Sequence, residues 1–130
     1  MKIEIKLSDG TYNKAVYFPV GLQYILSKTM ETRYKITSTR HADEKIKICH
    51  LSPNIYKTAL YGEVIEVEVK DNQIVKVITR LPSLFDNVDI CSAVAINGTE
   101  ARVKTVWTND RFDNHYTLRT ENYVKPKNKS

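Results

Sequence analysis

The feature that most constrains this chain is a series of strand patterns joined by tight turns, which begins after Gly62 and continues to Thr108. Apolar and polar residues alternate here with the period of two that is typical of strands. Asp71-Asn72 and Asn97-Gly98 are expected to be tight turns. Strands joined by such short connections pair antiparallel. The sequence therefore predicts a four-stranded meander with strands at Glu63–Lys70, Gln73–Arg80, Val88–Ile96 and Ala101–Thr108.

The same pattern predicts which side chains face the core. Nearly all of Val88–Ile96 is apolar, so we expect this segment to be a central strand. In the first strand of the meander, the alternation predicts that Ile65, Val67 and Val69 point inward and that Glu66 and Glu68 form a solvated face. In the last strand we expect Val103, Thr105 and Trp107 on one side, with Trp107 in the core.

The chain opens with a predicted hairpin, in which Lys2–Ser8 and Lys14–Phe18 flank the turn Asp9-Gly10. Apolar residues recur at helical spacing within Val20–Thr32, which predicts an amphipathic helix. The expected fold class is α+β, with a mainly antiparallel sheet (an N-terminal hairpin plus the four-stranded meander) packed against two helices.

The second of these helices is expected to begin at Ser52-Pro53, because serine caps free N–H groups and proline suits the first helical position. Gly62 would then be its C-cap. The preceding segment leaves two readings open. Ile36, Ile46 and Ile48 suggest short strands, whereas Arg40–Lys45 has the composition of a turn or of one helical turn.

Length and composition are those of one globular domain. The chain has 130 residues, of which 42% are hydrophobic and 27% are charged. We expect a single domain over residues 1–124 and a flexible basic tail over residues 125–130. No apolar run approaches the ~20 residues that span a bilayer, and the charged N-terminus is unlike a signal peptide. A cytoplasmic location is therefore expected, with Cys49 and Cys91 as reduced, buried thiols.

Several enzyme classes lack their motifs in this sequence. Four glycines are too few for a phosphate-binding loop or a dinucleotide fingerprint. Two cysteines and three histidines show no zinc-ligand spacing, and no serine nucleophile elbow is present. Cys49 and His50 are adjacent, and neighbours on an extended chain point to opposite faces. We therefore expect no metal, no cofactor and no familiar hydrolase or redox centre.

The net charge of +5 and the isoelectric point near 9.2 favour phosphate-bearing partners. Metal-free RNA cleavage would need a base, an acid and a cation for the developing phosphorane charge. The candidate catalytic residues are His41 and His115 as proton carriers and Arg80 as the cation, with Lys104 or Thr105 nearby. Each of the three also has a plainer interpretation: His41 as a surface histidine, His115 as a histidine that stabilises a loop, and Arg80 as a solvated strand end.

A ligand site is expected where polar side chains, aromatics and irregular backbone coincide. Only the loop Leu81–Asn87 and the segment Asn109–Tyr123 combine the three. Arginine can hold two oxygens of a phosphate at once, and loop aromatics can stack on a base. The candidate ligand-binding residues are Phe85, Arg111, Asn114, His115, Tyr116 and Arg119.

The expected order of two helices followed by four antiparallel strands resembles the barnase–EndoU–colicin–RelE superfamily of small RNases and toxins. Ser38–Lys45 resembles the helical His motif of some members, and Val103–Asn109 resembles their last strand. The residues from Thr105 to Tyr123 also resemble small uncharacterised phage and prophage proteins. The resemblance covers about Thr37 to Tyr123, and the opening hairpin is extra.

This resemblance implies either a metal-independent endoribonuclease or toxin, or a phage-type inhibitor of host defence. The apolar strand Val88–Ile96 and the turn Asp71-Asn72 leave few polar groups to face a common cleft. We therefore expect a non-catalytic binding protein that engages a nucleotide signal, a nucleic acid or a host defence protein. Exposed sheet edges are commonly covered by self-pairing, so a homodimer is expected, through the opening hairpin or through Ala101–Thr108.

Overall fold

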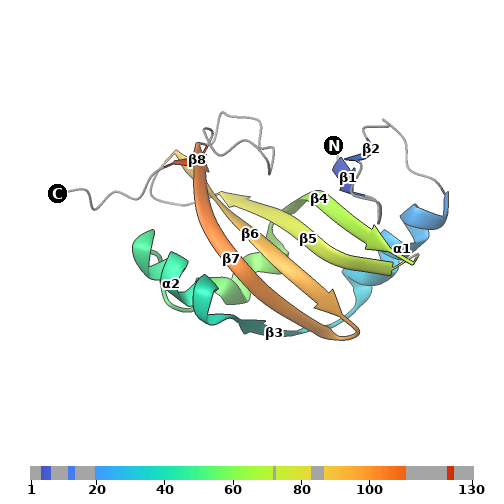
Figure 1. Cartoon of the computed structure of the whole chain (residues 1–130), viewed down its shortest axis with the longest axis horizontal. Coiled ribbons are helices and arrows are strands. Elements are labelled where there is room, and N and C mark those ends of the chain that lie inside the picture. The colour runs from blue at the N-terminus through green and yellow to red at the C-terminus, as the bar shows by residue number, and fades with distance from the viewer. Residues whose placement is uncertain are drawn as a thin grey trace.

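The computed structural model of this protein describes residues 4–6, 12–13, 20–71, 73–82, 87–110 and 123–124. The fold is α+β, as predicted, with a long curved sheet and helices beside it (Figure 1). The helices are α1 (Val20–Glu31), α2 (Arg40–Ile48) and the 3-10 helix η1 (Ile55–Tyr61). The strands are β1 (Glu4–Lys6), β2 (Tyr12–Asn13), β3 (Lys35–Ser38), β4 (Glu63–Lys70), β5 (Gln73–Pro82), β6 (Val88–Asn97), β7 (Glu100–Asp110) and β8 (Tyr123–Val124).

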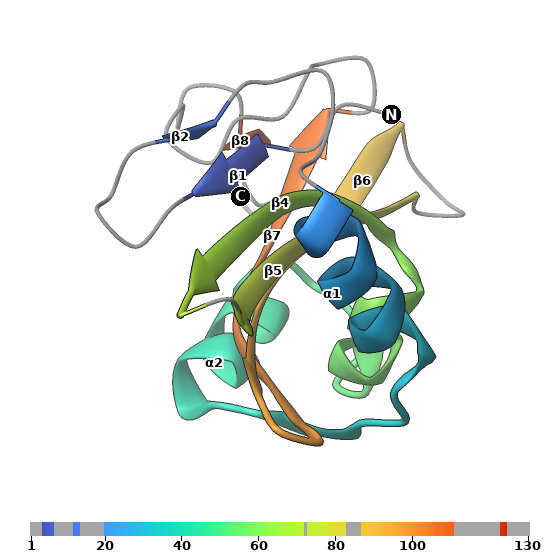
Figure 2. The same ribbon diagram turned by 90° about the vertical axis from the view of Figure 1, so that its right-hand side faces the viewer.

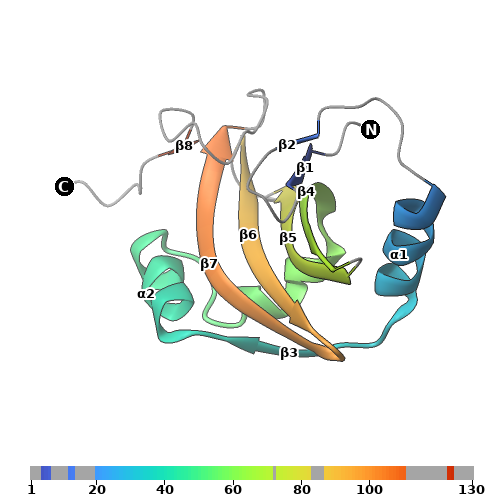
Figure 3. The ribbon, with the colours of Figure 1, turned by 45° about the vertical axis from the view of Figure 1, so that its right-hand side comes forward.

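The sheet confirms the antiparallel meander and adds strands to both sides of it. The strand order is β2-β1-β4-β5-β6-β7-β3, with β8 paired to the end of β7. The pairs β4–β5, β5–β6 and β6–β7 are antiparallel, whereas β1–β4 and β3–β7 are parallel. The opening hairpin lies at one edge, as expected. β7 is not the other edge, because β3 pairs with its first residues and α2 lies beside it (Figure 3).

Three bulges decide which residues face the helices. Ile65 in β4, Val75 in β5 and Lys104 in β7 are extra residues that interrupt the pairing with the neighbouring strand. A bulge shifts the alternation by one position. Val103 and Val106 therefore share the helix-covered face although they are three residues apart. The prediction that Val103 lies on the same side as Trp107 is wrong for this reason.

The main core lies between the sheet and the helices. Val67, Val77 and Val94 from three adjacent strands are fully or almost fully buried, with Ala42 and Ile46 of α2 in the same cluster. Figure 2 shows α1 and η1 on the same side of the sheet. From α1, Ile25 and Leu26 pack against this core. These contacts cover one face of the strands β4–β7.

The opposite face carries a second, smaller core. Ile78, Cys91, Ala93 and Trp107 are buried there, and Ile65 packs against them. Glu66 pairs with Ile78 and is only 7% exposed. Glu66 lies on the face away from the helices, as predicted, but the prediction that this face is solvated is wrong here, because this part of the sheet is covered on both sides. The bulge moves Ile65 to the same face, so the prediction that Ile65 points inward with Val67 is wrong as well. Trp107 is a core residue, as predicted.

Helix α2 resolves the ambiguous segment. Ile36 lies in a strand, as expected, but Ile46 and Ile48 lie in the helix rather than in strands. Thr39 is the N-cap: its hydroxyl accepts a hydrogen bond from the Ala42 N–H at 3.1 Å and donates to the Lys104 carbonyl at 3.1 Å. One side chain thus caps the helix and occupies the carbonyl of the β7 bulge.

The predicted second helix is shorter than expected. Pro53 and Asn54 form a turn, and the following η1 has Asn54 at its N-cap with no side-chain hydrogen bond. Gly62 has φ −73°, so it is not a left-handed cap. It is instead a point of close approach, because a Cβ there would lie 2.9 Å from the backbone of Arg80. In the opening hairpin the returning strand is β2, and Lys14–Phe18 lies outside the described residues.

Candidate functional site

Of the candidate site residues, the structure describes His41 and Arg80, together with the neighbouring Lys104 and Thr105. The remaining candidates lie outside the described residues, and their placement stays a prediction: Phe85, Arg111, Asn114, His115, Tyr116 and Arg119. Among the described candidates, Arg80 at the end of β5 is the one whose side chain joins a cluster of polar residues.

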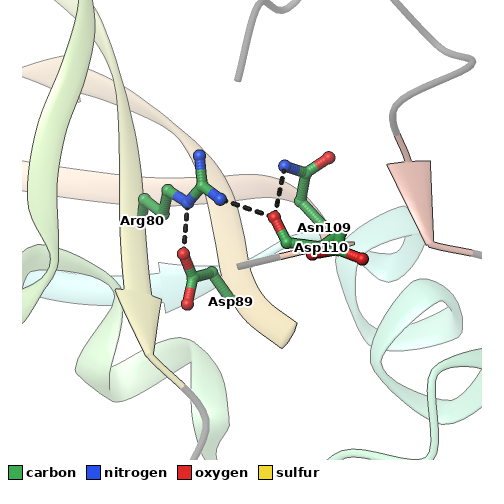
Figure 4. Close-up of polar contacts among 4 residues, drawn as sticks. All are labelled: Arg80, Asp89, Asn109 and Asp110. Carbon is green, nitrogen blue, oxygen red and sulfur yellow. Dashed lines mark hydrogen bonds and ion pairs between the residues drawn. The ribbon is translucent and has the colours of Figure 1, made fainter. Parts of the chain in front are cut away.

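Arg80 is held by the two strands that follow it in the sheet. Its Nε donates to Oδ2 of Asp89, at the start of β6, and the two groups form an ion pair (Figure 4). Its Nη2 donates to the main-chain carbonyl of Asp110 at 2.7 Å, at the end of β7. The Arg80 and Asp89 side chains are 12% and 7% exposed. Arg80 is therefore a nearly buried, paired cation and not a solvated strand end.

Asn109 completes this cluster. It is fully buried, and its Nδ2 donates to the same Asp110 carbonyl at 3.3 Å, so that one oxygen accepts two donors (Figure 4). Its Oδ1 is buried and has no hydrogen-bond partner among the described residues. Asp89 and Asn109 are directly opposite each other in the β6–β7 register. Four residues thus join the ends of β5, β6 and β7.

The sequence did not lead us to Asp89, and it pointed to Asn109 only as the first residue of the segment Asn109–Tyr123. A signal for Asp89 was present, because it is the only charged residue in the apolar segment Val88–Ile96. Carboxylates are almost never fully buried unless they are paired, so a lone one in a central strand predicts a cation on a neighbouring strand. Asn109 carries no such signal, because a polar residue near a strand end is common.

His41 and Arg80 do not share a site. His41 is exposed on α2, which lies beside β7 (Figure 3). Arg80 lies in β5, and both β6 and β7 separate that strand from the helix. Lys104 is exposed and Thr105 is half-buried on β7. The described residues therefore do not assemble the base, acid and cation that RNA cleavage requires. In this part of the chain no three His, Cys, Asp or Glu side chains are placed to hold a metal ion.

The two cysteines are free thiols in different surroundings. Cys91 is fully buried opposite Arg80 in the β5–β6 register, and burial raises its pKa to about 12; nearby Arg80 lowers the pKa and Asp89 raises it, each by less. Burial also raises the pKa of the half-buried Cys49. His50 follows α2 in the left-handed region, with φ 57°, so Cys49 and His50 are not on an extended chain as expected.

These thiols should differ in reactivity. At about pH 8, a disulfide reagent such as Ellman's should modify Cys49 slowly and leave Cys91 untouched, because only an accessible thiolate reacts. The Cys49→Ser variant should show no reactive thiol when folded and one thiol in concentrated guanidinium chloride. Modification of folded Cys49→Ser at the rate of a free thiol would contradict the burial of Cys91.

No helix in the described ranges has the length and apolar character needed to cross a membrane. Comparisons of this chain with protein-family models, with curated proteins and with solved structures gave no match. Any function proposed for this chain must therefore be inferred from its own residues.

Proposed function

We propose that this protein is a binding protein without turnover and that it engages a phosphate-bearing ligand, a nucleotide signal or a nucleic acid. The observation that carries the proposal is the pairing of Arg80. The strand cation best suited to stabilising a reacting phosphate is already bonded to Asp89 and to the Asp110 carbonyl.

The pairing of Arg80 opposes the ribonuclease alternative on energetic grounds. Removing one partner of a buried ion pair costs about 3–5 kcal/mol, because the other charge stays buried without compensation. A substrate phosphate that drew Arg80 away would face a cost of that order. The exposed His41 lies two strands away from Arg80 and offers no proton transfer at the same place.

The charge of the chain supports a phosphate-bearing ligand. The net charge is +5, and exposed basic side chains such as Lys35, Arg102 and Lys104 lie on the neighbouring strands β3 and β7. A positive surface attracts polyanions and speeds their association. We further propose a cytoplasmic homodimer that pairs through a sheet edge, which light scattering would show as twice the 15.0 kDa monomer mass. A host defence protein is the alternative partner.

The test is to incubate the protein with nucleotide signals and with bacterial RNA, and then to analyse the ligand after heat denaturation. A ligand that is bound and recovered unchanged supports the proposal. RNA fragments with 2′,3′-cyclic ends would instead establish the ribonuclease. A stable complex with a host protein, with no small ligand or nucleic acid bound, would replace the phosphate-bearing ligand by a protein partner.

A further inference from the structure

The second face of the sheet has a part that is not closed by the small core. At the end of the sheet away from Arg80, the register places Thr37 of β3, Arg102 of β7, Ala95 of β6, Lys76 of β5 and Glu68 of β4 in one row. Paired residues on adjacent strands share a face, so these side chains lie on the same side of the sheet. Ala95 is partly exposed, in contrast to the buried Ala93 nearer the core.

Basic side chains dominate this row and its surroundings. Lys35 pairs with Glu100 and lies two residues before Thr37 on β3, so it is on the same face as Thr37 and Arg102. Lys104 is exposed two residues further along β7. We name Lys35, Lys76, Arg102 and Lys104 the basic strip. Lys35, Arg102 and Lys104 are exposed and Lys76 is partly exposed.

The strip keeps most of its charge uncompensated within the described ranges. Arg102 donates to Glu100 at 3.1 Å in an exposed pair, which is worth little in water. Glu68 lies opposite Lys76 in the register. The side-chain ammonium groups of Lys35, Lys76 and Lys104 make no hydrogen bond or ion pair with another described residue. Four cations therefore face two carboxylates, Glu68 and Glu100, and the surface is net positive.

We propose that the basic strip binds the phosphate backbone of duplex DNA. This inference rests on the proposed function, the binding of a phosphate-bearing ligand, and specifies the binding surface and the kind of ligand. Strands are ~4.8 Å apart, so the strip from β5 to β3 extends over about 14 Å. That is longer than a single phosphate group and suits successive phosphates. A mononucleotide would instead need cations that converge on one point.

The side chains between the cations favour a duplex over other nucleic acids. Single strands are held by bases stacked on exposed aromatics, and no exposed aromatic of the described residues lies on this face. Recognition of double-stranded RNA uses hydrogen bonds to 2′-hydroxyls. Ala95, in the middle of the row, has no group to make one, and the hydroxyl of Thr37 is buried. The strip neutralises charge without reading sequence, so binding should be independent of sequence and strongly dependent on salt.

The experiment measures fluorescence anisotropy of a labelled duplex DNA of arbitrary sequence at several salt concentrations, with the full-length protein. The variant Arg102→Gln/Lys104→Gln should bind about tenfold more weakly, and its plot of log affinity against log salt should be less steep by about 2. The matched control is Lys28→Gln/Lys57→Gln, which removes two exposed cations from the helix side. It should bind as the unmodified protein does.

A variant that should bind DNA more tightly, and not more weakly, gives a second and independent test. Glu100→Gln removes a carboxylate from this face and releases Arg102, so it should tighten DNA binding about threefold. A general loss of structure cannot produce tighter binding. Unchanged or weaker binding by Glu100→Gln would overturn the assignment of this face.

The outcomes separate this inference from the proposed function. If duplex DNA binds and both pairs of variants lose affinity equally, the strip is not the site, although the binding function stands. If double-stranded RNA or a single strand binds more tightly than duplex DNA, the choice of duplex DNA is wrong. If no nucleic acid and no nucleotide binds, the proposed function fails as well.

Discussion

Replacement of Asp89 by alanine should lower the free energy of unfolding by about 3–5 kcal/mol. The variant leaves the Arg80 guanidinium in a nearly buried position without the carboxylate that compensates its charge. The measurement is urea unfolding at neutral pH. Trp107, the only tryptophan, is a suitable fluorescence probe because its strand position pairs with Cys91, opposite Arg80.

Two control variants test the reason for this loss. Arg80→Met/Asp89→Ala removes both charges and should regain part of the stability that Asp89→Ala loses. Glu44→Ala breaks the exposed ion pair between Arg40 and Glu44, at 3.4 Å, and should change stability by no more than about 0.5 kcal/mol. A loss below about 1 kcal/mol for Asp89→Ala would show that the pair does not hold the sheet end together.

Replacement of Trp107 by alanine should cost about 3–5 kcal/mol. Trp107 is 7% exposed and packs with Ile78, Cys91 and Ala93 on the face away from the helices. Truncation would remove its buried surface and leave a cavity in a small core that has few residues to fill it. Urea unfolding followed by circular dichroism measures the effect, since the variant has no tryptophan.

An exposed residue of β7, the strand that carries Trp107, provides the control for this prediction. Lys104→Ala should change stability by no more than about 0.5 kcal/mol, because Lys104 is exposed. Trp107→Phe keeps an aromatic ring and should lose less than Trp107→Ala. If Trp107→Ala were as stable as Lys104→Ala, the second face of the sheet would be solvated, as the alternation of β4 first indicated.

The meander was predictable because its signals are local. Period-two patterns and turn residues such as Asn97-Gly98 determine strands, pairing and order within a few residues of each other. The turn itself lies one residue later than predicted: Asn97 still pairs with Glu100, and Gly98 begins the two-residue loop with a positive φ of 60°. The bulges at Ile65 and Lys104 were not predictable from this pattern. An extra residue in one strand depends on the partner strand and on contacts such as that of Thr39 with the Lys104 carbonyl.

Helix α2 and the Arg80 cluster could not be predicted either, because both depend on contacts between segments far apart in the sequence. α2 has only two fully buried positions, Ala42 and Ile46, which is too little periodicity to distinguish a helix from a turn. Arg80 was singled out for its charge, but its partner Asp89 is known only once the β5–β6 register is known. The site expected around Arg111 and Arg119 lies outside the described residues and stays a prediction.

The two parallel strand pairs differ from the meander in the length of chain that must be closed to form them. β4–β7 are joined by short turns, so their contacts close small loops and can form early. Glu4 pairs with Glu66 and Lys35 with Glu100, so each parallel pairing joins residues more than 60 positions apart. Closing such loops costs chain entropy that only the finished meander can offset. We therefore expect the meander to form first and the N-terminal half to pair with both of its edges afterwards.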